Sequence, residues 1–200
     1  MPPNLFGSSE MPVIAGLRYN DEFVSSADQP SLIAAIGSVG LTPFRFQGWE
    51  GKRLTASFGW HYDFDQGGLS RATPFPEWLL PWRARAADFA GLDPDALVQA
   101  LVLRYDPGAA IGWHRDRPQF ENVIGISLCA PAILRLRRRT GPGRGGFERR
   151  SAPLTPGSIY HMAGEARHAW EHSIAPIAET RWSITFRSLS ERGRRLVSPA

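Results

Sequence analysis

Residues 122–139, NVIGISLCAPAILRLRRR, decide the fold class of this chain. Two short apolar or alternating runs flank the break at 129–131, and runs of this kind are typical of β-strands. Similar runs recur on both sides at intervals of about ten to fifteen residues: LVLRY at 101–105, GSIYHM at 157–162, WEHSIAPI at 170–177 and RWSITFR at 181–187. Short strands at this spacing, separated by Pro and Gly, predict an antiparallel jelly roll over about 101–188.

Upstream of residue 101 the sequence predicts helices and hairpins. Ser26 is a suitable N-cap before the apolar positions Leu32 and Ile36, so a helix is expected over about 26–38. The other expected elements are a strand within 13–19, strands or hairpins over 41–63 and a helix over 79–90. A short helix is also expected from Pro94 or Asp95, with Leu97 and Val98 on its apolar side. No linker is visible, so residues 13–190 are expected to form one domain between a tail at 1–12 and a basic tail at 191–200.

The composition excludes several classes of protein. Hydrophobic residues make up 42% of the 200 residues and charged residues 21%, which excludes a disordered chain. No apolar run reaches the roughly 18 residues of a membrane span, and the N-terminus has no basic and apolar segments typical of a secretory signal. The single cysteine, Cys129, excludes a disulfide framework and a cysteine-based zinc site. We therefore expect a cytoplasmic monomer with no membrane partner.

The net charge of +4 rests on arginine, because Lys52 is the only lysine. Seven arginines lie within residues 135–150 and three more within 192–195. Codon usage in a G/C-rich genome gives such a bias without any function, and charge runs are commonly solvated loops. Arginine also binds phosphate through its planar fork, so a nucleic-acid partner explains the clusters equally well.

The segment WHRD at 113–116 carries the first candidate chemistry. On a strand His114 and Asp116 point to the same side and offer an imidazole and a carboxylate, which are ligand types for a metal such as iron(II). A second histidine would complete a facial triad, and the candidates are His61, His161, His168 and His172. His168 and His172 share a face at a spacing of four, and spacing does not choose between them.

The run RWSITFR at 181–187 alternates strictly between apolar and polar residues. Arg181, Ser183 and Arg187 all lie on its polar face. An edge strand with a solvated face gives this pattern. A strand whose polar face lines a cavity gives it as well, because two long arginine side chains can converge on one small dicarboxylate.

These three motifs, in this order, resemble the AlkB-type branch of the iron(II)- and 2-oxoglutarate-dependent dioxygenases. The resemblance covers about residues 101–188, through LVLRYDPGAAIGWHRD, NVIGISLCAPAILRLRRR, LTPGSIYHMAGEARHAWEHSI and RWSITFR. It implies an α+β, mainly β fold: a double-stranded β-helix (jelly roll) core, with N-terminal helices and a hairpin lid at about 41–68 packed on it. It also implies Fe(II), 2-oxoglutarate and O2 as cofactor and cosubstrates.

The resemblance implies a role for each site residue. Iron would be bound by His114, Asp116 and His172, because His172 stands before Ser-Ile where the family has Gly-Ile or a similar pair. The residues expected at 2-oxoglutarate are Tyr105 through its hydroxyl, Arg181 at the far carboxylate, Ser183, and Arg187, which would lie near the iron-proximal carboxylate and support Asp116. The chain departs from the family at Leu103 and Ser183, where asparagine is common.

The resemblance also implies a substrate class, the N-alkylated bases of DNA or RNA, which are dealkylated by oxidation as in DNA repair. Trp60 and Tyr62, within the expected lid, are candidates for stacking on the base, although plain hairpin packing explains them as well. Phosphates would be contacted by Arg137, Arg138 and Arg139. Two alternatives stand beside this reading: the same oxygenase chemistry on a protein side chain or small molecule, and a non-catalytic module that binds phosphate backbones.

Overall fold

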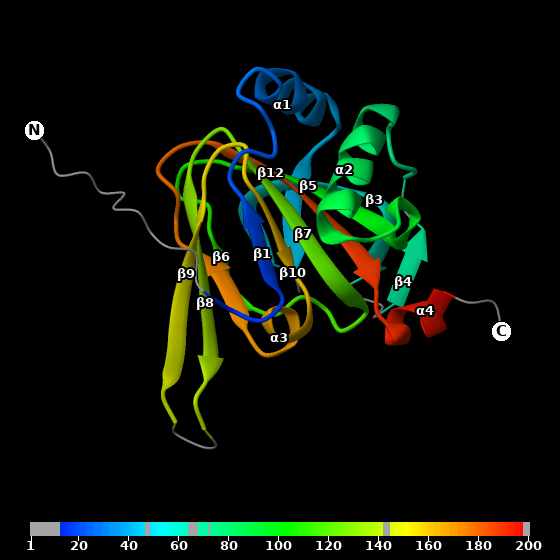
Figure 1. Ribbon diagram of the computed structural model, residues 1–200. Helices are drawn as coiled ribbons and strands as arrows, with labels where there is room; N and C mark the ends of the chain where they lie inside the picture. The colour runs from blue at the N-terminus through cyan, green and yellow to red at the C-terminus, as the bar shows by residue number, and fades with distance from the viewer. Residues whose placement is uncertain (1–12, 47–48, 64–67, 72, 142–144, 198–200) are drawn as a thin grey trace, which may run out of the picture.

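Figure 1 shows the computed structural model, which describes residues 13–46, 49–63, 68–71, 73–141 and 145–197. Two antiparallel sheets face each other and confirm the predicted jelly-roll core. The larger sheet has the order β1-β10-β7-β12-β5-β3-β2 with β4 paired to β3, and its strands are β1 (Leu17–Asn20), β2 (Thr42–Phe46), β3 (Trp49–Asp63), β4 (Gly68–Arg71), β5 (Leu97–Tyr105), β7 (Phe120–Leu128), β10 (Ile159–Met162) and β12 (Arg181–Leu189). The smaller sheet has the order β6-β11-β8-β9, from β6 (Ile111–His114), β8 (Ala132–Arg139), β9 (Phe147–Leu154) and β11 (Glu171–Ile174).

Strand β12 lies in the middle of the larger sheet, between β7 and β5, so the edge-strand interpretation of residues 181–187 is wrong. Its apolar residues Ile184 and Phe186 are buried in the core cluster that includes the helices. The polar residue Ser183 is the Cα partner of Leu103, which packs in the other cluster with β8 of the smaller sheet. The polar face of β12 therefore looks into the space between the two sheets.

Two helices cover the outer face of the larger sheet: α1 (Gln29–Ser38) and α2 (Leu80–Ala90), the latter preceded by the 3-10 turn η1 (Glu77–Leu79). Leu32 and Ile36 of α1 are buried as predicted, and a fully buried side chain of this kind contributes about 1.5–3 kcal/mol. Helix α1 begins three residues later than expected, because Asp28 and not Ser26 is its N-cap. Helix α2 ends where Gly91 adopts a left-handed conformation with φ of 70°.

Three further segments complete the fold. The helix expected from Pro94 is one 3-10 turn, η2 (Pro94–Ala96), and the prediction for Leu97 and Val98 is wrong because both begin β5. Helix α3 (Gly164–His168) lies between β10 and β11, and α4 (Glu191–Val197) occupies most of the expected basic tail. The expected tail at 1–12 lies outside the described residues. Within the part of the chain that the structure describes, no helix is long and apolar enough to cross a membrane.

Candidate metal and cosubstrate site

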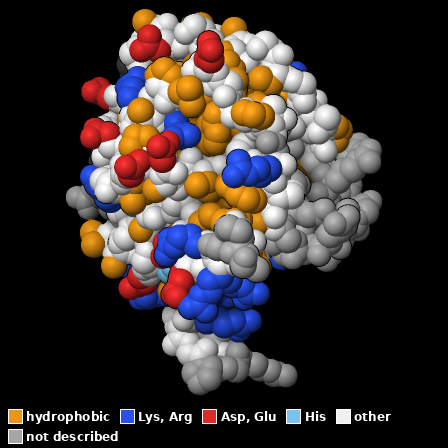
Figure 2. Space-filling model, turned by 90° about the vertical axis from the view of Figure 1, so that its right-hand side faces the viewer, with side chains coloured by type: hydrophobic (Ala, Val, Ile, Leu, Met, Phe, Trp, Pro, Cys, Tyr) orange, Lys and Arg blue, Asp and Glu red, His pale blue; other side chains and the backbone are white. Residues whose placement is uncertain are grey.

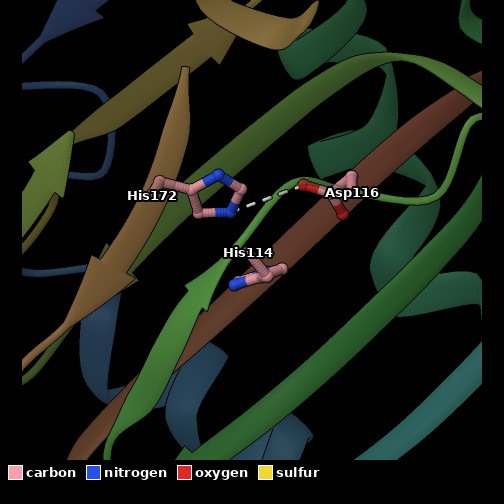
Figure 3. A group of neighbouring side chains, drawn as sticks. All are labelled: His114, Asp116 and His172. Atoms are coloured by element: carbon pink, nitrogen blue, oxygen red, sulfur yellow. Dashed lines mark ion pairs between the residues drawn. The ribbon is translucent and has the colours of Figure 1, made fainter. Parts of the chain in front are cut away.

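The fold brings His114, Asp116 and His172 together (Figure 3), with one ligand atom of each within 4.8 Å of the others. His114 on β6 and His172 on β11 are Cα partners in the smaller sheet, and their ring centroids are 4.3 Å apart. Asp116 lies in the loop just beyond the end of β6. His114 and Asp116 therefore come from a strand end and the following loop, and not from one straight strand as the sequence predicted. Two imidazoles and a carboxylate are the ligand set of a facial triad for iron(II).

Asp116 is a buried carboxylate held by one arginine. Its side chain is 7% exposed. Its Oδ1 accepts a hydrogen bond from Nε of Arg187 at 2.8 Å and also forms an ion pair with Nη2 of the same arginine at 2.8 Å. Burial, the largest single influence, raises the pKa of Asp116, but the charges around it together outweigh burial and hold this pKa below its ordinary value. Arg187 makes the largest of these charge contributions, followed by His172, His114 and Arg167. Oδ2 lies 3.5 Å from Nε2 of His172 and has no hydrogen-bond partner. A buried carboxylate oxygen without a donor is costly, and a metal cation would satisfy it.

Both histidines fit the same metal. Burial lowers the pKa of His172 to about 3 although Asp116 raises it, so the imidazole is neutral at pH 7. Nδ1 of His114 lies 2.9 Å from the carbonyl oxygen of Gly112. Because a carbonyl oxygen only accepts, this bond places the proton on Nδ1 and leaves Nε2 with a free lone pair. The donor set therefore fits an iron(II) ion.

The other histidine candidates lie apart from this group. Nε2 of His168, at the end of α3, is 2.9 Å from Oε1 of Glu121, and the His168 side chain is 52% exposed. Nε2 of His161 is bonded to Oδ1 of Asn122 at 2.8 Å. The side chain of His61 lies outside the described residues. Of the described candidates, His172 is the histidine that the fold places beside His114 and Asp116.

A second group lies on the inner face of the larger sheet. Arg181 and Tyr105 are Cα partners, each 2% exposed, and the guanidinium carbon is 5.1 Å from the centroid of the Tyr105 ring. Nε of Arg181 donates to Oγ of Ser127 at 3.1 Å, whereas its Nη1 is buried without a partner. Ser183 is buried on the same face, opposite Leu103. A buried guanidinium with an unpartnered nitrogen fits a carboxylate such as that of 2-oxoglutarate.

Arg187 lies on the same face of β12 and links this row to the metal group. Besides its pair with Asp116, its Nη1 donates to Oε1 of Gln99 at 3.1 Å. The predicted contact of Arg187 with Asp116 is therefore present in the structure.

The metal loop is held by Arg167, a residue that the sequence did not single out. Arg167 belongs to α3 and is 4% exposed. Its Nη2 donates to the carbonyl oxygens of Asp116 at 3.0 Å, Arg117 at 2.6 Å and Phe120 at 2.8 Å. These bonds fix the backbone that carries Asp116.

The residues expected to contact the substrate do not form one group among the described side chains, in contrast to the three metal-site residues. The Trp60 ring lies 5.2 Å from the guanidinium carbon of Arg71, and the side chain of Tyr62 lies outside the described residues. Two of the three arginines are already paired with carboxylates: Arg137 with Glu171 at 2.6 Å, and Arg138 with Glu148 and Glu165, each at 2.7 Å. Arg139 is exposed beside the Phe147 ring. Arg137 and Arg138 thus have less free charge for phosphate than the sequence predicted.

Sequence reasoning also missed Arg53, which shares the inner face of the larger sheet with Tyr105. A usable signal exists in the strand over 49–63, where Arg53, Thr55 and Ser57 alternate with the apolar residues Leu54, Ala56 and Phe58. No comparable signal marks Arg167, because its partners lie about fifty residues earlier in the chain.

In sequence, the chain is similar to known 2OG-Fe(II) oxygenases. A family model described as the 2OG-Fe(II) oxygenase superfamily matches residues 61–196. The chain is 32% identical to the alpha-ketoglutarate-dependent dioxygenase AlkB of Salmonella typhimurium, over 54% of this chain and 52% of that protein. It is 26% identical to the alkylated DNA repair protein ALKBH8 homolog of Arabidopsis thaliana, over 80% of this chain and 51% of that protein. The chain spans about half the length of the curated relatives it matches.

Solved structures show the same fold. The structure of OsALKBH1 matches with a TM-score of 0.67 and 16% identity, over 86% of this chain and 96% of that chain. A 2OG-Fe(II) oxygenase family oxidoreductase from Burkholderia pseudomallei matches with a TM-score of 0.62 and 15% identity, over 88% of this chain and 85% of that chain. At these identities the matches show the fold alone, a core of two facing antiparallel sheets.

Proposed function

Because the chain belongs to the 2OG-Fe(II) oxygenase superfamily, we propose that it is an Fe(II)- and 2-oxoglutarate-dependent dioxygenase that dealkylates N-alkylated bases of DNA or RNA. The observation that carries this proposal is that two buried polar atoms, Oδ2 of Asp116 and Nη1 of Arg181, each lack a hydrogen-bond partner. One lies in a His-Asp-His group suited to iron(II), and the other suits a carboxylate.

His114, Asp116 and His172 would hold the iron. Iron(II) held there would activate O2, which would oxidise 2-oxoglutarate to succinate and CO2 and a C–H bond of the substrate to an alcohol. One oxygen atom enters succinate and the other the alkyl carbon. Arg187 keeps Asp116 charged and oriented, and Arg167 fixes the backbone of its loop.

Arg181 would bind one carboxylate of 2-oxoglutarate, with Tyr105 and Ser183 beside it on the same inner face. Leu103 packs in the apolar core and offers no hydrogen bond, so the serine hydroxyls of Ser127 and Ser183 are the nearby polar groups. The hydroxylated N-alkyl group then releases the base and an aldehyde, because a carbon bearing both nitrogen and hydroxyl collapses when the nitrogen takes back a proton.

The choice of alkylated bases rests on the relatives and on surface charge. Two relatives are named for alkylated DNA repair or as AlkB dioxygenases. On the face shown in Figure 2, Lys and Arg side chains gather near the end from which the β8–β9 hairpin projects. Such a cluster favours a polyanionic substrate.

The proposal is tested by incubating the protein with Fe(II), 2-oxoglutarate and either methylated oligonucleotides or bulk cell peptides, followed by mass spectrometry. We expect loss of the methyl mass from oligonucleotides together with equimolar formaldehyde and succinate. Asp116→Ala is the inactive control. Demethylated or hydroxylated peptides with unchanged oligonucleotides would instead establish a protein substrate, and absence of iron binding would leave the phosphate-binding module.

A further inference from the structure

A third arginine faces the space between the sheets beside the cosubstrate residues. Arg53 on β3 is the Cα partner of Tyr105 on β5, and Tyr105 is the partner of Arg181 on β12. Cα partners on neighbouring strands project to the same face of a sheet, so these three side chains form one row. Arg53 ends the row on β3, the strand that pairs with β5 along one edge and with β2 along the other.

The guanidinium of Arg53 is positioned but not neutralised. Its carbon lies 3.9 Å from the centroid of the Phe44 ring, a cation–π contact that orients the head group. Its Nε is buried without a hydrogen-bond partner, and no carboxylate of the described residues pairs with it. Burial lowers the pKa of Arg53, Tyr105 raises it and Arg187 lowers it, so the charged head lies within reach of both of these groups.

Among the side chains that the structure describes, positive charge exceeds negative charge around the site. Arg53, Arg181 and Arg187 face it from the larger sheet, and Arg167 lies behind Asp116, the carboxylate to which Arg187 is paired. An iron(II) ion and the doubly negative 2-oxoglutarate cancel each other in charge, so loading the site leaves this excess in place. A cationic substrate is therefore repelled, and a neutral group rich in acceptors is favoured.

Building on the proposed function, we infer that Arg53 recognises the alkylated base itself, donating hydrogen bonds to a ring carbonyl oxygen of a neutral base and disfavouring bases that alkylation makes cationic. Arginine carries donors only, so a carbonyl oxygen fits it and an amino group does not. N3-methylthymine is neutral and has carbonyl oxygens on both sides of its methylated nitrogen. N1-methyladenine is cationic at neutral pH and has no carbonyl oxygen.

The test uses short single-stranded oligonucleotides carrying one N3-methylthymine or one N1-methyladenine, supplied in competition and followed by mass spectrometry. We expect the wild type to demethylate N3-methylthymine at least about tenfold more efficiently than N1-methyladenine. In Arg53→Met this ratio of efficiencies should fall about tenfold. Arg104→Met is the matched control, because Arg104 pairs with Asp106 and lies over Trp182 on the opposite face of the same sheet. If Arg53→Met does not fold by circular dichroism, Arg53→Gln removes the charge while keeping a donor.

A second readout separates substrate from cosubstrate. Binding of 2-oxoglutarate in the presence of Mn(II), measured by intrinsic fluorescence, should change by less than about threefold in Arg53→Met. A loss as large as that of Arg181→Ala would assign Arg53 to 2-oxoglutarate and overturn the inference. So would equal turnover of the two bases, or a preference that Arg53→Met retains, and both results leave the proposed function standing. A wild type that demethylates neither oligonucleotide contradicts the proposed function and this inference together.

Discussion

His168 and His172 stand four residues apart, but their surroundings differ in the way that decides metal binding. His172 is buried and neutral beside Asp116, whereas His168 is half exposed and paired with Glu121. We predict that His172→Ala loses iron binding and that His168→Ala retains it. Anaerobic Fe(II) titration of both variants checks this prediction. Loss of iron in His168→Ala with retention in His172→Ala would reverse the ligand assignment.

Arg181 offers the strongest single contact for a dicarboxylate. A hydrogen bond to a charged group is worth about 1.5–3 kcal/mol, so Arg181→Ala should raise the dissociation constant of 2-oxoglutarate at least about tenfold. Calorimetric titration with Mn(II) in place of iron measures this change without turnover. Arg104→Ala, which removes an arginine from the outer face of the sheet, serves as the control. An unchanged affinity in Arg181→Ala would contradict the cosubstrate assignment.

At the scale of secondary structure, periodicity predicted the strands and the C-terminal ends of helices α1 and α2 well, but it predicted a helix at Leu97 where strand β5 begins. Apolar and polar residues alternate over 181–187 because one face of this strand packs against the helices and the other faces the space between the sheets. This alternation can be read from the sequence alone. The helix expected from Pro94 failed at Leu97 because that residue is buried by pairing within the larger sheet, a contact far away in the chain. The choice of His172 and the position of Arg53 depend on strand register in the same way.

The β8–β9 hairpin carries arginines of two kinds. Arg137 is paired with Glu171 and is partly buried, whereas Arg139 and Arg149 are more exposed and their guanidinium carbons lie 5.1 and 5.6 Å from the centroid of the Phe147 ring. We predict that Arg139→Gln with Arg149→Gln reduces the salt slope of oligonucleotide binding by about one to two units, since each lost phosphate contact removes nearly one. Arg137→Gln should change the slope little. Fluorescence anisotropy across a range of salt concentrations measures both, and equal slopes in all three proteins would exclude this hairpin from the interface.

For the whole molecule, we predict that the free energy of unfolding falls in mild acid because His161 is buried in its neutral form. Burial lowers the pKa of His161 to about 4, and the charge of Arg18 on the paired strand acts in the same direction. The unfolded chain keeps an ordinary value of about 6.5, so it binds this proton first as the pH falls, and the free energy of unfolding decreases between pH about 6.5 and 4. From these two pKa values, His161 should account for at most about 3 kcal/mol of that loss.

Urea unfolding of the wild type and of His161→Gln at several pH values measures this share. The glutamine variant keeps a donor toward Asn122 and has no group that titrates in this range. Its stability should therefore depend less on pH than that of the wild type. Parallel curves for the two proteins would show that His161 does not titrate as its surroundings indicate.

Arg167 ties together two stretches of chain that each hold part of the candidate metal group. It reaches the loop of Asp116 from α3, which runs directly into β11 and His172. The conformational entropy of bringing these stretches into place is therefore lost when the chain folds and not when an ion arrives. A preorganised pocket of this kind captures its metal without a further search among backbone conformations, and selectivity among ions then follows from the fixed spacing of its donors.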